Sequence, residues 1–149
     1  MQKLCRWVLS ECSEFNINLD EIHTRYENLE LFALAFKALH YRPAYLAHCA
    51  EELISYRRVA IVSQFVGALS EGGETSGTAR PIEVNSHEPS RYVSDILAWV
   101  HQSLATEKEF AFLIYTNPKE SSGSALPTVQ NHLEKVFDAL CRPLTGRIE

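Results

Sequence analysis

The chain has 149 residues, of which 46% are hydrophobic and 22% charged. This is the length of one ordinary domain with enough apolar side chains to bury a core, which excludes a disordered tail. With a net charge of −5 at pH 7, the chain lacks the basic footprint of a nucleic-acid-binding protein and the lysine clusters that hold proteins on anionic membranes.

The first half of the chain is predicted to hold three helices. Apolar residues recur at helical spacing from about Gln2 to Phe15, and the polar residues from Asn16 to Asn28 predict a loop or short helix. The next apolar stripe, from Leu29 to Leu39, ends at Arg42, because a residue before proline is pushed out of helical dihedral angles. The longest predicted helix is Pro43–Leu69, since proline suits the first helical position and a glycine at 72 or 73 is a natural stop.

The stretch after the long helix is predicted to be a loop that leads into another helix. Glu71 to Pro81 is rich in glycine, serine and threonine and indicates a flexible loop. It lacks the Gly-Lys-Ser/Thr ending of a phosphate-binding loop. Ile82 to Val84 alternates as a short extended segment would. Asn85 to Pro89 indicates a helix entry, with Ser86 or Glu88 as the cap and the proline first in the helix.

A helix is predicted over residues 89–115, because its apolar residues follow 3.6-residue spacing. Tyr92, Ile96 and Leu97 are expected to be buried against the C-terminal end of the long helix. Trp99 is expected at the edge of the contact.

A second loop is predicted over 116–127, which is rich in serine, glycine and proline. A final helix within 128–149 carries Val129, Val136 and Leu140 on one face and ends at Arg142-Pro143. The helices together predict an all-α fold, either a bundle or a stack of helical hairpins. The chain divides accordingly into residues 1–70, 71–88, 89–115, 116–127 and 128–149.

The sequence shows no motif of a catalytic or metal site. The six histidines form neither HExxH nor a zinc-finger spacing, so they are expected on the surface or at helix caps. They are His23, His40, His48, His87, His101 and His132. No GxSxG or other nucleophile signature is present. We therefore predict no catalytic, cofactor-binding or metal-ligating residue, and no cofactor.

The charged pairs on the predicted helices are interpreted as solvated surface. Glu107, Lys108 and Glu109 are expected on a solvent-facing helix side. Arg57 and Arg58 form a small basic spot, which is expected to pair with the carboxylates at 51 and 52.

The cysteines and the apolar stretches indicate the cellular compartment in which the protein works. The four cysteines, Cys5, Cys12, Cys49 and Cys141, contain no CxxC pair. Their even number permits disulfides, but without a secretion signal free thiols in a reducing compartment are favoured. The charges at 6 and 11 interrupt any signal-peptide core. The longest apolar stretch, Leu31 to Leu39, is too short to span a bilayer.

Several segments of the chain resemble subunit 6 of the conserved oligomeric Golgi complex. The most specific is Arg80 to Gln102, which is similar to the family pattern RPIE…SH.P.RYV.D.LAW.HQ and continues into Ala105 to Glu109. Shorter similarities lie at Arg6-Trp7, Ser10–Cys12, Arg42–Tyr45, Tyr56–Arg58, Phe65–Leu69, Gly72-Gly73, Cys141–Leu144 and Arg147–Glu149. The stretch from Phe110 to Gln130 follows the family less closely.

This resemblance implies a non-catalytic segment of a helical rod in a vesicle-tethering complex. The implied role is support of retrograde transport within the Golgi apparatus, peripheral on the cytosolic face of its membrane. The implied partners are the other subunits of the complex, together with SNARE proteins and small GTPases, and no nucleic acid. Two alternatives stay open at this point: a free-standing helical adaptor and a helical enzyme domain.

Overall fold

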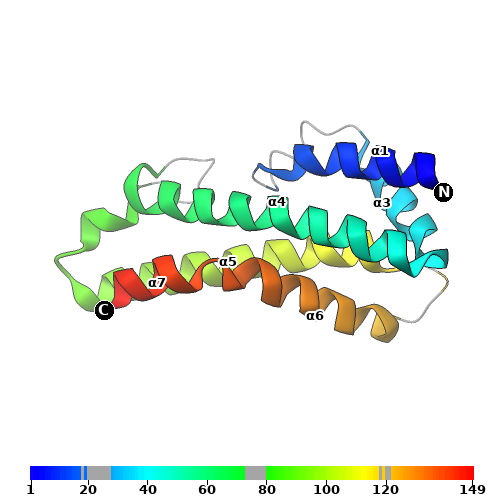
Figure 1. Cartoon of the computed structure of the whole chain (residues 1–149). Helices are drawn as coiled ribbons and strands as arrows, with labels where there is room; N and C mark the ends of the chain where they lie inside the picture. Colours follow the sequence, from blue (N-terminus) through cyan, green and yellow to red (C-terminus); the bar gives the residue numbers. More distant parts are fainter. Residues whose placement is uncertain (18, 20–27, 73–79, 118, 120–121) are drawn as a thin grey trace.

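A computed structural model describes residues 1–149 except 18, 20–27, 73–79, 118 and 120–121 (Figure 1). Helices make up all the regular structure in the described residues, and none of these residues lies in a strand. The predicted all-α class is therefore confirmed. The elements are α1 (Gln2–Cys12), η1 (Ser13–Phe15), α3 (Leu29–Ala38), η2 (Leu39–Tyr41), α4 (Pro43–Ser70), η4 (Ile82–Asn85), α5 (Pro89–Tyr115), α6 (Ser122–Asp138) and α7 (Cys141–Ile148).

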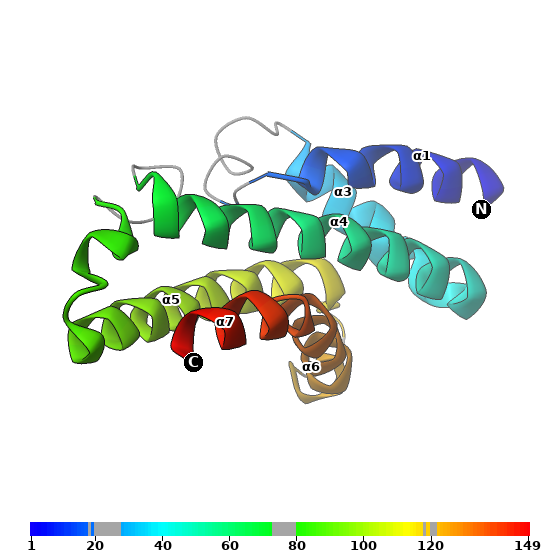
Figure 2. The ribbon, with the colours of Figure 1, turned by 60° about the vertical axis from the view of Figure 1, so that its left-hand side comes forward.

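The two longest helices, α4 and α5, run in opposite directions along the length of the molecule (Figures 1 and 2). Helices α1 and α3 pack together at the N-terminal end of α4, while α6 contacts both α4 and α5. Among the described helices, none is long and apolar enough to cross a membrane. The result is a bundle with α4 and α5 as its spine.

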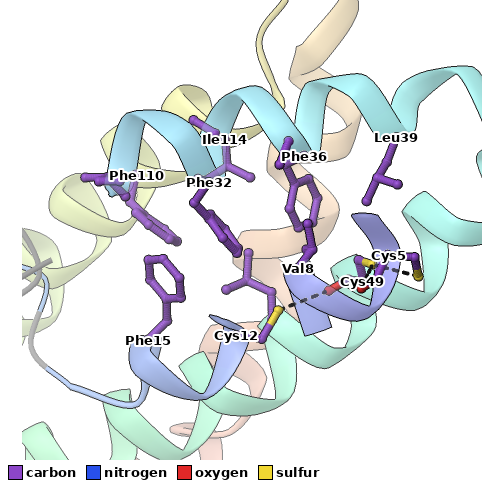
Figure 3. Close-up of a cluster of buried hydrophobic side chains, with 14 of the residues drawn as sticks. Cys5, Val8, Cys12, Phe15, Phe32, Phe36, Leu39, Cys49, Phe110 and Ile114 are labelled. Atoms are coloured by element: carbon purple, nitrogen blue, oxygen red, sulfur yellow. Dashed lines mark hydrogen bonds between the residues drawn. The ribbon is translucent and has the colours of Figure 1, made fainter. Parts of the chain in front are cut away.

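Two apolar clusters hold the bundle together. The first joins α1, α3, the first half of α4 and the end of α5, and its phenylalanine rings contact one another in tilted pairs (Figure 3). Within it, Phe15 and Phe32 have ring centroids 4.5 Å apart, and Phe15 and Phe110 5.5 Å. The second cluster joins the far half of α4 to the start of α5 and to the end of α6. Aromatic pairs at these separations stabilise a fold by more than the burial of their apolar area alone.

Prolines begin the two long helices as predicted. Arg42, with φ −135° and ψ 82°, and Glu88, with φ −110° and ψ 93°, are both non-helical and precede Pro43 and Pro89. The expected cap on α5 is only half right. Glu88 occupies the N-cap position, but no side-chain capping hydrogen bond forms there. The rigid proline therefore defines this helix start without a side-chain cap.

Gly72 ends α4 in the left-handed region, with φ 67°. The N–H groups of Glu71 and Gly72 both donate to the carbonyl of Gly67, each at 2.9 Å. A Cβ on Gly72 would lie 2.7 Å from backbone atoms of Arg80 and Pro81. Glycine is thus required here for both its conformation and the close return of the chain.

Two local predictions were wrong. Ile82 to Val84 is not extended but forms the 3-10 helix η4, in which Ile82 is buried in the second cluster. Three alternating residues carry too little pattern to separate the two states. The last helix also differs, because α6 already begins at Ser122, inside the predicted loop, and contains Pro127. It ends at Asp138, and Pro143 lies in the first turn of α7, where its missing N–H costs no hydrogen bond.

The buried face of α5 is rotated from the predicted one. Ile96 is fully buried and Tyr92 half-buried, as expected, but Leu97 is 52% exposed. Trp99, expected at the edge, is only 6% exposed and packs on Phe65 at a centroid distance of 5.3 Å. The indole ring buries more apolar area than a leucine, so the helix turns its tryptophan inward.

Candidate functional site

The interior of the bundle contains a polar network between its two apolar clusters. Of the described residues that are buried, the charged or polar ones are Arg57, Glu107 and His132, at 0%, 0% and 1% exposure. They come from α4, α5 and α6 respectively. Charged side chains are almost never this buried unless they are paired.

Arg57 and Glu107 form a forked ion pair. Arg57 Nη2 donates to Glu107 Oε2 at 2.8 Å, and Nε donates to Oε1 and Oε2 at 3.1 and 3.2 Å. This geometry matches the planar guanidinium to the planar carboxylate, and it gives the strongest type of charge-assisted hydrogen bond. The pair joins α4 to α5 at the middle of the bundle.

The remaining donors of Arg57 hold the chain after α1. Arg57 Nη1 donates to the carbonyl of Phe15 at 2.8 Å and to that of Ile17 at 2.7 Å. Its guanidinium carbon lies 5.8 Å from the centroid of the Phe110 ring. One side chain therefore ties α4 to α5 and to the segment around residues 15–17.

His132 extends the network to α6. Its Nε2 lies 3.0 Å from Glu107 Oε1, and its Nδ1 lies 3.1 Å from the hydroxyl of Tyr115. Because a carboxylate only accepts hydrogen bonds, Nε2 carries the proton of this contact. In the neutral ring, Nδ1 then accepts from the hydroxyl of Tyr115, so every polar atom of the imidazole is satisfied.

Burial and charge set the protonation of this network. Burial by itself raises the pKa of Glu107, but the charge of Arg57 and the hydrogen bonds from His132 and Arg57 outweigh it, so the net pKa is lowered. Burial, followed by the negative charge of Glu107, raises the pKa of Tyr115. At neutral pH the network therefore holds an ionised carboxylate and a protonated phenol.

This network is placed to stabilise the fold, because its groups cannot reach a substrate. A general acid or base has to reach the reacting group of a substrate, and these three side chains are at most 1% exposed. Their hydrogen bonds are directed at one another, at the hydroxyl of Tyr115 and at backbone carbonyls of the same chain. The arrangement therefore fixes the relative positions of three helices, which a purely apolar core does less specifically.

A group of thiols lies in the first apolar cluster. Cys5 Sγ of α1 is 3.6 Å from Cys49 Sγ of α4, and Cys12 lies beside them (Figure 3). Burial is the largest cause that raises the pKa of Cys12 and of Cys49 to about 12. Cys5, Cys12, Cys49 and the exposed Cys141 are all free thiols, as favoured from the sequence. Cys12 and Cys49 are poor nucleophiles, because the thiolate is the reactive form and their pKa is so high, and they pack as small apolar side chains.

Several predicted surface positions need correction. Glu107 is buried with Arg57 rather than solvated, and Arg57 does not pair with position 51 or 52. Glu51 pairs instead with Lys135 of α6. Arg58 donates to the carbonyl of Lys135 at 2.8 Å and lies 3.7 Å from Asp138.

The histidine prediction holds for most positions and fails for one. The exposed histidines are His40, His48, His87 and His101, whereas His132 is buried. His23 lies outside the described residues. No group of three or more potential metal ligands gathers among the residues that the structure describes, and the absence of a metal, a cofactor and catalytic residues stays a prediction.

A signal for the missed network was present in the sequence. Glu107 precedes Phe110 and Ile114 at the spacing of one helical face, and Arg57 follows Leu53 and precedes Ile61 in the same way. A charged residue at a core position of a helix points to a buried partner. Spacing within one helix cannot identify that partner, which lies on another helix.

Comparison with known proteins extends over the whole chain. Residues 1–149 match the family model described as "Conserved Oligomeric Golgi complex subunit 6, C-terminal". Proteins named "Conserved oligomeric Golgi complex subunit 6" are similar to it. That of Arabidopsis thaliana is 35% identical, with 99% of this chain and 23% of the relative covered. The Drosophila melanogaster protein is 34% identical, with 100% of this chain and 22% of the relative covered. The Homo sapiens protein is also 34% identical, with 99% of this chain and 21% of the relative covered.

This chain thus spans about a fifth of the length of these curated relatives. No solved structure matches it.

Proposed function

Because this chain belongs to the family of conserved oligomeric Golgi complex subunit 6, we propose that it is a non-catalytic helical segment of a Golgi vesicle-tethering complex. It acts through contacts with other proteins and supports retrograde vesicle transport within the Golgi apparatus. The observation that carries this proposal is the family match over all 149 residues.

The buried polar network supports a scaffold role. Arg57, Glu107 and His132 use their hydrogen bonds to align α4, α5 and α6 and offer no group to a solute. A rigid bundle with a fixed helix alignment suits a protein that presents surfaces to partners.

The surface supports the same role. Large apolar side chains are exposed on α3 and α5 in the described residues, among them Leu31 at 52%, Leu34 at 62% and Leu97 at 52%. Single exposed apolar residues are ordinary, whereas two on the same face of one helix, as Leu31 and Leu34 are on α3, favour contact with other proteins.

The proposed partners are the other subunits of the complex, with SNARE proteins and small GTPases as further contacts. The proposed location is the cytosolic face of the Golgi membrane, held peripherally. We also propose the division into 1–70, 71–88 and 89–115, whereas the predicted boundary between 127 and 128 falls inside α6.

Two alternative functions, a free-standing adaptor and a helical enzyme domain, would require other properties of the protein. A free-standing adaptor would carry the same fold without entering the complex. A helical enzyme domain would need converging polar groups in an accessible pocket, and the converging groups of this chain are buried.

A segment exchange tests the proposal. The Drosophila relative aligns with the chain over 149 residues, so its own segment can be replaced by this chain in fly cells that lack the endogenous subunit. We expect the chimera to co-purify with the fly complex and to restore Golgi glycosylation, whereas the relative with its segment deleted does neither. A chimera that folds, as measured by its helical circular dichroism, but does not enter the complex contradicts the proposal.

A further inference from the structure

One side of α5 is exposed along about four turns and has an unusual composition. We define the α5 outer face by its residues, which are Ser94, Leu97, Ala98, His101, Leu104, Ala105 and Lys108, all exposed. At 100° per residue they occupy about 120° of the helix circumference, opposite the buried Ile96 and Trp99. In Figure 2 the first half of α5 lies along the lower edge of the molecule, below α4.

The spacing on this face suits a second helix. Leu97 and Leu104 are seven residues apart, and so are Ala98 and Ala105. A seven-residue repeat keeps the same groups facing a neighbouring helix over successive turns. The two alanines let another backbone approach closely, and the two leucines, at 52% and 38% exposure, provide apolar side chains to cover.

The charge on this face differs from that of the chain. The chain has a net charge of −5, yet the α5 outer face carries Lys108 and the titratable His101 and no carboxylate. The acidic residues nearest to this face are hydrogen-bonded to other residues or lie outside the face. Asp95 accepts a hydrogen bond from Asn85 Nδ2 at 3.2 Å, Glu107 is buried with Arg57, and Glu109 lies beyond the edge of the face.

We propose that the α5 outer face docks one amphipathic helix of a sister subunit, with apolar residues at seven-residue spacing and carboxylates beside them. This inference rests on the proposed function and names the surface through which it is carried out. The carboxylates of the partner helix meet Lys108 and His101, which sets the helix orientation. A second copy of this chain is disfavoured as the occupant, because an isologous contact would bring His101 against His101 and add no carboxylate.

The contact is short. Residues 94–108 span about 21 Å of helix at 1.5 Å per residue. An interface of this length is at the small end of specific protein contacts, so it works as one of several contacts in an assembly.

Site-specific photocrosslinking in cells tests this docking. A photoreactive phenylalanine replaces Leu97 in the tagged protein, and the crosslinked peptides are sequenced by mass spectrometry. The matched control carries the same group at Val66, which lies on α4 and is 51% exposed. We expect position 97, and not 66, to crosslink to a single predicted amphipathic helix of a sister subunit that carries carboxylates beside its apolar residues.

Charge variants sharpen the test. Lys108→Glu is expected to lower the crosslink yield at position 97 at least fivefold, and Lys108→Arg to preserve it. Circular dichroism checks that both variants keep their helices. Crosslinks from position 97 to a second copy of this chain, or to a segment without carboxylates, would overturn the inference. A crosslink yield at position 97 no higher than at position 66 would overturn it as well. If sister subunits co-purify while position 97 crosslinks to none of them, only this inference fails; if none co-purifies, the proposed function fails as well.

Discussion

Arg57 and Glu107, fifty residues apart in the chain, share a fully buried ion pair with Nη2 and Oε2 2.8 Å apart. The pair connects the middle of α4 to the C-terminal third of α5, and its remaining hydrogen bonds reach the chain after α1 and the imidazole on α6. Its members depend on each other, because a buried charge without its partner is far more costly than the intact pair.

Removing one partner should therefore be strongly destabilising. We expect Glu107→Ala to lower the free energy of unfolding by about 3–5 kcal/mol, because it leaves the Arg57 guanidinium buried without its counter-ion. Urea unfolding followed by circular dichroism at 222 nm measures this.

The double variant Arg57→Met, Glu107→Leu is the control, and its loss of unfolding free energy should be smaller than the sum of the losses for Arg57→Met alone and Glu107→Leu alone. Additive losses would show that the two side chains are not coupled.

The same pair predicts a pH dependence. The pKa of Glu107 is lowered in the folded state from its ordinary value of 4.5. The stability from this carboxylate is therefore complete above about pH 4.5 and is lost as the pH falls through the lower folded pKa. Unfolding free energies measured between pH 7 and pH 3 should fall in the native protein.

Glu107→Gln removes the titrating group, so its curve should be flatter over the acidic part of this range. Parallel curves for the two proteins would contradict the assignment.

The rotation of α5 can be tested by residues on its opposite sides. Ile96→Ala should destabilise the chain by about 2–5 kcal/mol, because it leaves a cavity in the second cluster. Leu97→Ala and His101→Ala should each cost less than about 1 kcal/mol, since both side chains are exposed. Thermal and urea unfolding distinguish these values. An equal loss for Ile96→Ala and Leu97→Ala would restore the rotation expected from the sequence.

Local sequence patterns could predict much of this fold. The start of α5 at Pro89 and the burial of Phe32 and Phe36 on one side of α3 follow from proline geometry and helical spacing. Which side chain of α5 faces inward depends instead on whether Trp99 or Leu97 packs better against α4. Such competition between helices is absent from the spacing within one helix.

The partners within the buried network could not be identified from the sequence for a related reason. Glu107 stands between Thr106 and Lys108 and looks like part of a solvated charged run. Only the arrival of Arg57 and His132 from two other helices makes its burial favourable. A charged residue at a core position predicts that a partner exists, and the folded chain identifies it.

The end of α4 gives a test of backbone geometry. Gly72→Ala should destabilise the chain by more than about 1 kcal/mol, because its φ of 67° and the 2.7 Å approach of Arg80 and Pro81 leave no room for a Cβ. Gly146→Ala is the matched control. Its Cβ meets nothing within 4 Å and lies in α7, so it should be neutral or stabilising by up to about 1 kcal/mol. The melting temperatures of the two variants should therefore move in opposite directions, or only that of Gly72→Ala should fall.

Affinity purification of the native protein asks whether this chain acts, as we propose, as a segment of a Golgi tethering complex. The protein is tagged at its own gene, purified from a detergent lysate under mild conditions and analysed by quantitative mass spectrometry. We expect the other subunits of the conserved oligomeric Golgi complex to co-purify in near-equal amounts with the tagged protein. Recovery of the tagged protein with none of those subunits, from cells in which the complex itself is intact, would contradict it.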